Sequence, residues 1–283
     1  GERFGRLRLP VFETGLLETG DGPIPWRLWK AAASPSADPL PLLVRVYGGP
    51  GSRLVEDRWD GGVLFDALLV ARGWQVLEAD GRGTRGFGAR RVRAVRGRLG
   101  LGEVEDQARV VRHLARRPDV DGRRVGILGW SFGGTLACLA LTRHGDVFRA
   151  GVAIAPVTDW RLYDTIYTER YLGLPQVDPA AYRATAATTH AGGLDGWLLL
   201  VHGTADENVH VENTERLAAA LEAAGKPSFE VMRVPGRRHG LGGARRKVFR
   251  RVLAFLDEHL AGGDRLREPQ GARSRGVGSG DAR

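Results

Sequence analysis

The amino-acid sequence predicts an α/β fold in which helices cover both faces of a mostly parallel β-sheet. Short apolar stretches alternate along the chain with longer helical segments, and this alternation is typical of parallel strands joined by helices. Hydrophobic residues make up 42% of the 283 residues, so the chain can bury one large α/β core or two small ones. Glycine-rich segments follow two of the predicted strands, as expected where the chain turns sharply at a sheet edge.

The two ends of the chain differ in pattern from the part between them. Residues 1–33 contain two alternating stretches, 6–13 and 26–33, separated by a Gly-Asp-Gly-Pro turn, and they predict a hairpin at the edge of the sheet. Residues 34–260 carry the alternating strands and helices of the main domain. Residues 261–283 are rich in glycine, arginine and serine without an apolar period, which predicts a disordered basic tail.

Within the main domain, apolar runs of strand length alternate with runs of helix length. Strands are predicted over 42–47, 74–79, 125–128, 151–155, 197–201 and 229–234. Helices are predicted over 65–72, 103–117, 135–143, 214–224 and 244–260. A turn is expected at 119–122, and an aromatic-rich insertion at 156–175 interrupts the alternation. Because strands and helices alternate at this spacing, the strands are expected to run parallel.

A Gly-x-Ser-x-Gly pattern at 129–133 joins a predicted strand to a predicted helix, with Ser131 at its centre. Such a nucleophile elbow is typical of the α/β-hydrolase fold, where a tight turn exposes the serine and flanking glycines relieve the strained backbone. The alternative is a glycine-rich turn of a Rossmann-like sheet in which Ser131 only caps the helix. The pattern alone is weak in a chain with 41 glycines, so the residues downstream decide between the two.

A nucleophilic serine needs a base within hydrogen-bond reach, and that base needs an orienting acid. In an α/β hydrolase these residues come in the order Ser, Asp, His, each on a loop after a strand. Asp206 follows the next-to-last predicted strand and His239 follows the last one. Asp159 and Asp195 are rival acids, but neither ends a strong apolar strand. We therefore expect a triad of Ser131, Asp206 and His239.

The remaining histidines are expected to be structural. Two of them lie too close to Asp206 in sequence to form a separate arm of a triad. The others lie on helices or in a loop without a preceding strand. These residues are His113, His144, His190, His202, His210 and His259.

The chain carries a net charge of +9, from 42 basic and 33 acidic residues. Arginines cluster between 82 and 98 without an acid, and without a nucleic-acid motif we expect a solvated face or an acidic partner segment rather than nucleic acid. The single cysteine, Cys138, excludes an intrachain disulfide and a multi-cysteine metal site, and neither metal nor cofactor is expected. No signal peptide or membrane-spanning run is present, so no membrane contact is expected and a cytoplasmic location is favoured.

Six motifs spread over residues 7–260 are more specific than the elbow. They are VYGGPG at 46–51, DGRGT at 80–84, GWSFGG at 129–134, APVTDW at 155–160, YTERYLGLP at 167–175 and HGTADENVH at 202–210. Together they resemble the catalytic domain of the prolyl oligopeptidase family, and its dipeptidyl peptidase IV-like branch fits best. The resemblance implies a serine peptidase that works through an acyl-enzyme, with Tyr47 Oη and the Phe132 backbone N–H holding the oxyanion.

The resemblance also implies a substrate pocket that accepts proline between aromatic walls. The matching substrate-binding positions are Trp130, Val157, Trp160, Tyr163, Tyr167, Asn208 and Val209. Independently of the family, the spacing of residues 160, 163 and 167 would place three aromatic rings on one face if the segment were helical. On spacing alone, an aromatic core stripe is the more common meaning of such a pattern.

The chain departs from the family in two ways. Full-length members carry a β-propeller before the hydrolase domain, and this propeller is expected upstream in the full-length protein. In addition, Phe132 stands where close relatives often have tyrosine. The resemblance therefore implies a peptidase domain that cleaves peptides after proline or alanine, with a homodimer as one expected assembly. An esterase or acyl-aminoacyl hydrolase on the same fold, and an inactive dimerisation module, are the alternatives.

Overall fold

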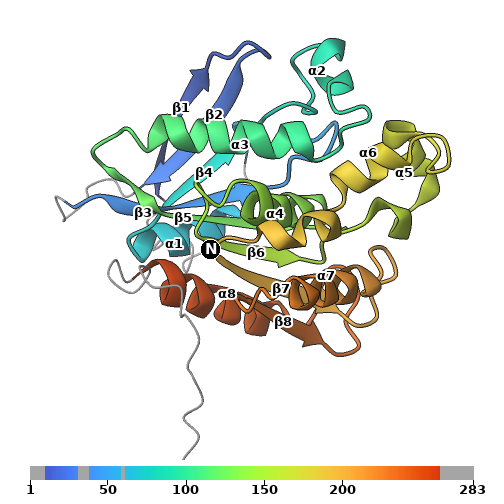
Figure 1. The fold of residues 1–283 in the computed structure, drawn as a ribbon. Coiled ribbons are helices and arrows are strands. Elements are labelled where there is room, and N and C mark those ends of the chain that lie inside the picture. Colours follow the sequence, from blue (N-terminus) through green and yellow to red (C-terminus); the bar gives the residue numbers. More distant parts are fainter. Residues whose placement is uncertain (1–9, 31–37, 59–60, 262–283) are drawn as a thin grey trace, which may run out of the picture.

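The computed structural model describes residues 10–30, 38–58 and 61–261, and these residues form one eight-stranded sheet (Figure 1). The strand order is β1-β2-β4-β3-β5-β6-β7-β8. Strands β1, β2 and β4 pair antiparallel, and the strands from β4 to β8 pair parallel. The strands are β1 Val11–Leu17, β2 Ile24–Lys30, β3 Leu40–Val46, β4 Gln75–Ala79, β5 Val120–Trp130, β6 Ala150–Ile154, β7 Trp197–Gly203 and β8 Phe229–Val234.

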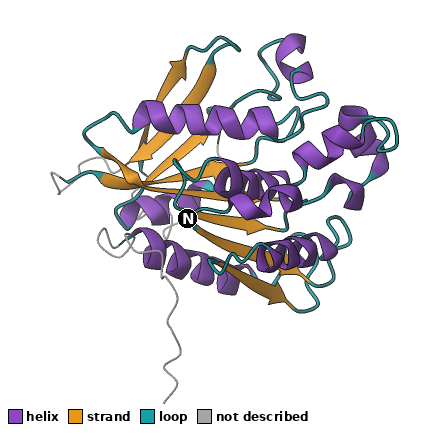
Figure 2. Ribbon diagram, in the orientation of Figure 1, coloured by secondary structure: helices purple, strands orange, loops and turns teal. Residues whose placement is uncertain are grey.

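Helices cover both faces of this sheet (Figure 2). One face packs on α3 (Leu101–Leu114), α4 (Phe132–Arg143) and α7 (Glu212–Ala223). The opposite face packs on α1 (Val63–Ala71) and α8 (Arg245–Leu260). The shorter helical segments are α2 Ala89–Arg93, η2 Trp160–Leu162, α5 Thr165–Leu172, α6 Pro179–Thr185 and η3 Ala187–Gly193.

The central strands are buried from both sides, which explains their continuous apolar sequences. Leu198 and Leu200 of β7 are fully buried on the face covered by α3, α4 and α7, and Leu199 and Val201 of the same strand are fully buried on the face covered by α1 and α8. Each such side chain contributes roughly 1.5–3 kcal/mol of burial free energy. The parallel strands β3, β5, β6, β7 and β8 thus end at one rigid edge, where α/β proteins bind their ligands.

The predicted α/β fold is confirmed, and the local differences have identifiable causes. The first strand, Val11–Leu17, begins within the predicted 6–13 stretch and continues beyond it. The first residues of that stretch lie outside the described part of the chain, as does the predicted tail from residue 262. The turn expected at 119–122 is largely part of β5, because Val120 and Asp121 pair with the start of β3. No periodic signal marked α2, a helix of five residues.

The arginine cluster at 82–98 is only partly a solvated face. Arg91 is buried and donates to the carbonyl oxygens of Gly81 at 3.1 Å and Asp80 at 2.5 Å. Arg82 pairs with Asp106 of α3 at 2.8 Å. These two arginines therefore stabilise the loop after β4 through hydrogen bonds and an ion pair. The expectation of a solvated face applies only to the exposed arginines of the cluster.

Candidate active site

Ser131 lies in a strained turn between β5 and α4. Its backbone has φ 58° and ψ −120°, and its N–H donates to Ile154 O at 2.8 Å. A side chain on either flanking glycine would collide with backbone: a Cβ on Gly133 would lie 2.2 Å from Val46 O, and one on Gly129 would lie 2.0 Å from Gly133 O. The turn thus packs against the neighbouring strand β3 as a nucleophile elbow does, and leaves the serine half-buried at the end of β5.

His239 and Asp206 meet across the ends of the two neighbouring strands. His239 follows β8, Asp206 follows β7, and Nδ1 of the histidine lies 2.7 Å from Oδ2 of the aspartate. The carboxylate accepts the Nδ1 proton in this geometry, which leaves Nε2 with a free lone pair. A histidine held in this tautomer can act as a general base.

Asp206 is held as an anion by several donors. Its Oδ1 accepts from the backbone N–H groups of Asn208 at 3.0 Å and Val209 at 2.9 Å. Burial alone would raise the pKa of Asp206, but hydrogen bonds from His202, His239 and the Val209 backbone outweigh it and hold this pKa well below its usual range. The aspartate is therefore charged at neutral pH and stabilises a positive charge on His239.

A second histidine, His202, also contacts Asp206. It is fully buried, with Nε2 2.8 Å from Val209 O and 3.4 Å from Asp206 Oδ2, and Nδ1 2.7 Å from Thr214 Oγ1. Its structural role agrees with the prediction, but its contact with the acid does not follow from any sequence signal. It positions the loop that carries both the acid and two residues of the predicted pocket.

Trp130 links the serine elbow to the histidine loop. Its indole Nε1–H donates to the backbone carbonyl of His239 at 3.1 Å, and Arg245 packs on its ring at 5.7 Å. Arg245 also donates to Gly240 O at 2.9 Å. The backbone carbonyls of His239 and Gly240 therefore both accept hydrogen bonds, the first of them from Trp130, which directly precedes Ser131. Trp130, predicted to bind substrate, is placed by these contacts to position the base.

Replacing Trp130 with phenylalanine should lower kcat about five- to tenfold and leave KM nearly unchanged. The ring stays, but the hydrogen bond that positions His239 is lost, a change of about 1 kcal/mol. Steady-state kinetics on a peptide amide measures kcat and KM separately. Trp197→Phe, which removes an indole N–H at the opposite end of β7, is the matched control. A fall in thermal stability without a fall in kcat would contradict the positioning role.

The predicted oxyanion donors lie beside the elbow. Tyr47 follows β3 and its ring centroid lies 6.5 Å from that of Phe132. Partial burial raises the pKa of Tyr47, so the phenol keeps its proton at neutral pH. Phe132 is the first residue of α4, where backbone N–H groups have no acceptor within the helix. Both groups can therefore donate to an oxygen that becomes negative next to Ser131.

Aromatic rings continue from Phe132 into the predicted substrate pocket. The Trp160 ring lies 5.7 Å from Phe132, 6.0 Å from Tyr163 and 6.1 Å from Tyr167. Tyr163 Oη donates to Asn208 Oδ1 at 3.4 Å, which closes the ring of contacts back to the Asp206 loop. The structure thus brings the aromatic residues, Asn208 and the elbow into one cluster.

The aromatic residues at 160, 163 and 167 do not share one helix. Trp160 lies in η2, Tyr163 lies between the two helical segments, and Tyr167 lies in α5. Asp159 and Asp164 cap these two segments by accepting from backbone N–H groups, which explains the break. The rings nevertheless converge, as predicted. Val157 and Val209, the apolar members of the predicted pocket, are buried.

The rival acids have other positions. Asp159 pairs with Arg161 at 2.5 Å, besides capping η2. Asp195 lies before β7, at the end of the sheet away from Ser131. Neither has a contact with His239 in the described part of the chain, and Asp206 has one at 2.7 Å.

The chain is similar to known proteins over most of its length. The sequence profile of the prolyl oligopeptidase family matches residues 65–263. A curated "Probable dipeptidyl-aminopeptidase B" of Ajellomyces capsulatus (strain NAm1 / WU24) is 39% identical over 230 residues, which are 78% of this chain and 25% of that protein. The protein of the same name from Uncinocarpus reesii (strain UAMH 1704) is 42% identical over 225 residues, which are 78% of this chain and 24% of that protein.

A solved structure extends the similarity to the whole sheet. Porphyromonas gingivalis dipeptidyl peptidase 4 is 34% identical, covers 92% of this chain and 37% of its own chain, and superimposes with a TM-score of 0.86. This agreement in three dimensions identifies the sheet and its helices as an α/β-hydrolase fold. The chain spans 25% or less of the length of the two curated relatives above. The chain belongs to the prolyl oligopeptidase family of serine peptidases, in its dipeptidyl peptidase IV-like branch.

Proposed function

We propose that this chain is the catalytic domain of a serine peptidase that cleaves peptide bonds after proline or alanine. The observation that carries the proposal is the 2.7 Å contact between His239 and Asp206 next to the strained elbow of Ser131. An orienting carboxylate, a histidine with a free Nε2 and a serine that is only half-buried are the parts that acyl transfer needs. The family membership supports the same reaction.

The proposed mechanism proceeds in two halves. Ser131 Oγ attacks the scissile carbonyl while its proton moves to His239 Nε2, and the charged Asp206 stabilises the imidazolium that forms. Tyr47 Oη and the Phe132 N–H donate to the oxyanion. His239 then protonates the leaving amine, which departs and leaves an acyl-Ser131 ester. Water repeats the sequence through His239, releasing the acid and restoring the serine.

The aromatic cluster is the basis for proposing proline at the cleaved position. Trp160, Tyr163 and Tyr167 present flat surfaces in mutual contact, and a rigid pyrrolidine ring has little conformational entropy to lose against them. Because Asn208 accepts from Tyr163 through Oδ1, its Nδ2 group is left to donate to a substrate carbonyl. This donor would fix the peptide next to the proline.

Tyr47→Phe tests the proposed oxyanion hole. Loss of the hydroxyl should lower kcat roughly 10²–10³-fold, because one donor contributes about 3–4 kcal/mol to the transition state and little to the ground state. KM should change little. Tyr182→Phe, which removes a hydroxyl that donates to Gly173 O, serves as the control and should retain kcat. Equal kcat values for Tyr47→Phe and the unaltered chain would remove Tyr47 from the mechanism.

The proposed function is tested by hydrolysis of a Gly-Pro chromogenic amide beside a small aryl ester, with Ser131→Ala as control. Serine-dependent cleavage of the amide would support a post-proline peptidase. Serine-dependent cleavage of the ester alone would favour the esterase alternative, or an amide specificity that depends on another domain. A folded chain that cleaves neither would favour an inactive dimerisation module.

We extend the proposal to the surroundings of the domain. Residues 34–260 are assigned to the peptidase domain, residues 1–33 to its edge segment and residues 261–283 to a basic tail. The proposed substrates are peptides, and the proposed assembly is a homodimer. A β-propeller is proposed to lie upstream in the full-length protein. No helix in the described ranges is long and apolar enough to cross a membrane, and the cytoplasmic location stays a prediction.

A further inference from the structure

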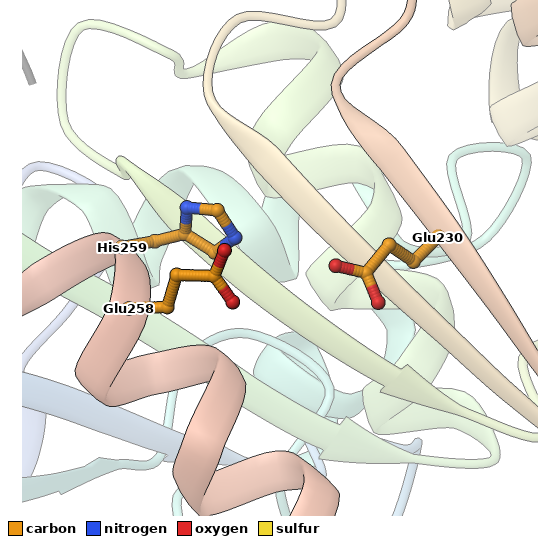
Figure 3. Close-up of side chains that lie close together, drawn as sticks. All are labelled: Glu230, Glu258 and His259. Carbon is orange, nitrogen blue, oxygen red and sulfur yellow. The ribbon is translucent and has the colours of Figure 1, made fainter.

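Three potential metal ligands converge at the end of the sheet opposite to Ser131. Glu230 is the second residue of β8, and Glu258 and His259 lie in the last turn of α8. One ligand atom from each residue lies within 4.8 Å of the other two, a cluster that the structure shows nowhere else in its described ranges. Figure 3 shows the imidazole and the Glu258 carboxylate side by side on α8, with Glu230 reaching toward them from the strand.

His259 supplies a buried nitrogen that has no hydrogen-bond partner among the described residues. Its side chain is only 6% exposed, and Nε2 makes no hydrogen bond to any described residue. The ring is held in place by stacking on Trp197 at 4.3 Å and by the edge of Phe255 at 4.5 Å. In the tautomer that carries its proton on Nδ1, Nε2 presents a lone pair that accepts no hydrogen bond from the described residues.

The two carboxylates leave oxygens free for a cation. Glu258 is exposed and forms no salt bridge within the described part of the chain. Glu230 contacts Arg251 through Oε2, which leaves Oε1 available. The carbonyl end of α8 adds a partial negative charge at the same place. Two carboxylates and a helix C-terminus thus face the imidazole nitrogen, and only Glu230 has a cationic partner, Arg251, in the described part of the chain. A divalent cation would bind between the free carboxylate oxygens and this nitrogen.

We propose that Glu230, Glu258 and His259 form a zinc site that ties the last helix to the edge strand of the sheet. Nitrogen and carboxylate ligands suit Zn²⁺, whereas Mg²⁺ and Ca²⁺ prefer oxygen alone. Zinc–ligand distances of about 2.0–2.2 Å require the ligand atoms to come closer than 4.8 Å, and the flexible glutamate side chains can make that adjustment around the fixed ring. Water completes the tetrahedron.

Calorimetric titration of the metal-free chain with Zn²⁺ tests the site. His239→Ala is the background for all samples, because His239 and Asp206 form a second place where zinc could bind. We expect one zinc per chain. Glu258→Gln, an exposed substitution, should weaken binding at least tenfold, and Glu222→Gln on α7 is the matched exposed control. Equal zinc affinities in the two variants would overturn the proposal.

Two further readouts locate the ion. Bound Co²⁺ should quench Trp197, which stacks on His259, so the quenching should disappear in Trp197→Phe and in Glu258→Gln. Arg251→Gln should tighten zinc binding, because the competing cation is removed from Glu230. Zinc should raise the melting temperature of the background chain but not that of Glu258→Gln, and Mg²⁺ should do neither. Quenching that persists in Glu258→Gln would place the metal elsewhere.

Discussion

Ser131→Ala should reduce kcat/KM on a Gly-Pro amide roughly 10⁵–10⁶-fold, the loss expected when the nucleophile of a triad is removed. The fold should survive, because the positive φ of 58° depends on the backbone and Cβ, which alanine keeps. The hydrogen bond from the residue's N–H to Ile154 O is also unaffected. Thermal unfolding of the variant should therefore match that of the unaltered chain within about 1 kcal/mol.

A variant that combines Ser131→Ala with His239→Ala tests whether the two residues act together. His239→Ala alone should cost nearly as much activity as Ser131→Ala, and the double variant should be little worse than either, because the base has no function without the nucleophile. Activity in each protein is measured against the same peptide amide at equal concentrations of folded chain. Losses that simply add in free energy would show that the two residues act independently, and would remove His239 from the role of base.

The parts of the site that could be predicted are those encoded by the ends of parallel strands. Ser131, Asp206 and His239 each follow a strand, and neighbouring parallel strands bring their carboxyl ends together whatever lies between them in sequence. The Asp206–His239 contact follows directly from that rule, because β7 and β8 are adjacent. The fold is predictable for the same reason: an apolar run buried on both faces reads clearly as a central strand.

The contacts that escaped prediction depend on side chains reaching between loops. Nothing in the spacing of Trp130 and His239 shows that an indole N–H will meet a backbone carbonyl 109 positions later. The buried Leu241 in the histidine loop has φ 50°. A leucine rarely adopts this left-handed conformation, so the sequence does not indicate it. The break between η2 and α5 could not be located from the aromatic spacing, which fits one helix equally well, and it depends on the caps Asp159 and Asp164.

Asp206→Asn should lower kcat about 10⁴-fold while leaving the fold intact. The reason is that one carboxylate oxygen of Asp206 already accepts two backbone hydrogen bonds. Oδ1 accepts from the backbone N–H groups of Asn208 and Val209, so the asparagine side chain must place its oxygen there and its NH₂ group at the position of Oδ2. His239 Nδ1 would then face a donor instead of an acceptor, and the imidazole would have to carry its proton on Nε2.

A histidine protonated on Nε2 cannot accept the proton of Ser131, so the loss should appear in kcat rather than in KM. The pH profile of Asp206→Asn separates this cause from simple misfolding: activity should recover partly at high pH, where hydroxide replaces the histidine as base. Asp195→Asn, a neutralised carboxylate at the opposite end of β7, should keep full activity. If Asp206→Asn instead retained kcat, the orientation of His239 would depend on the Trp130 hydrogen bond, and the carboxylate would serve mainly to hold the loop.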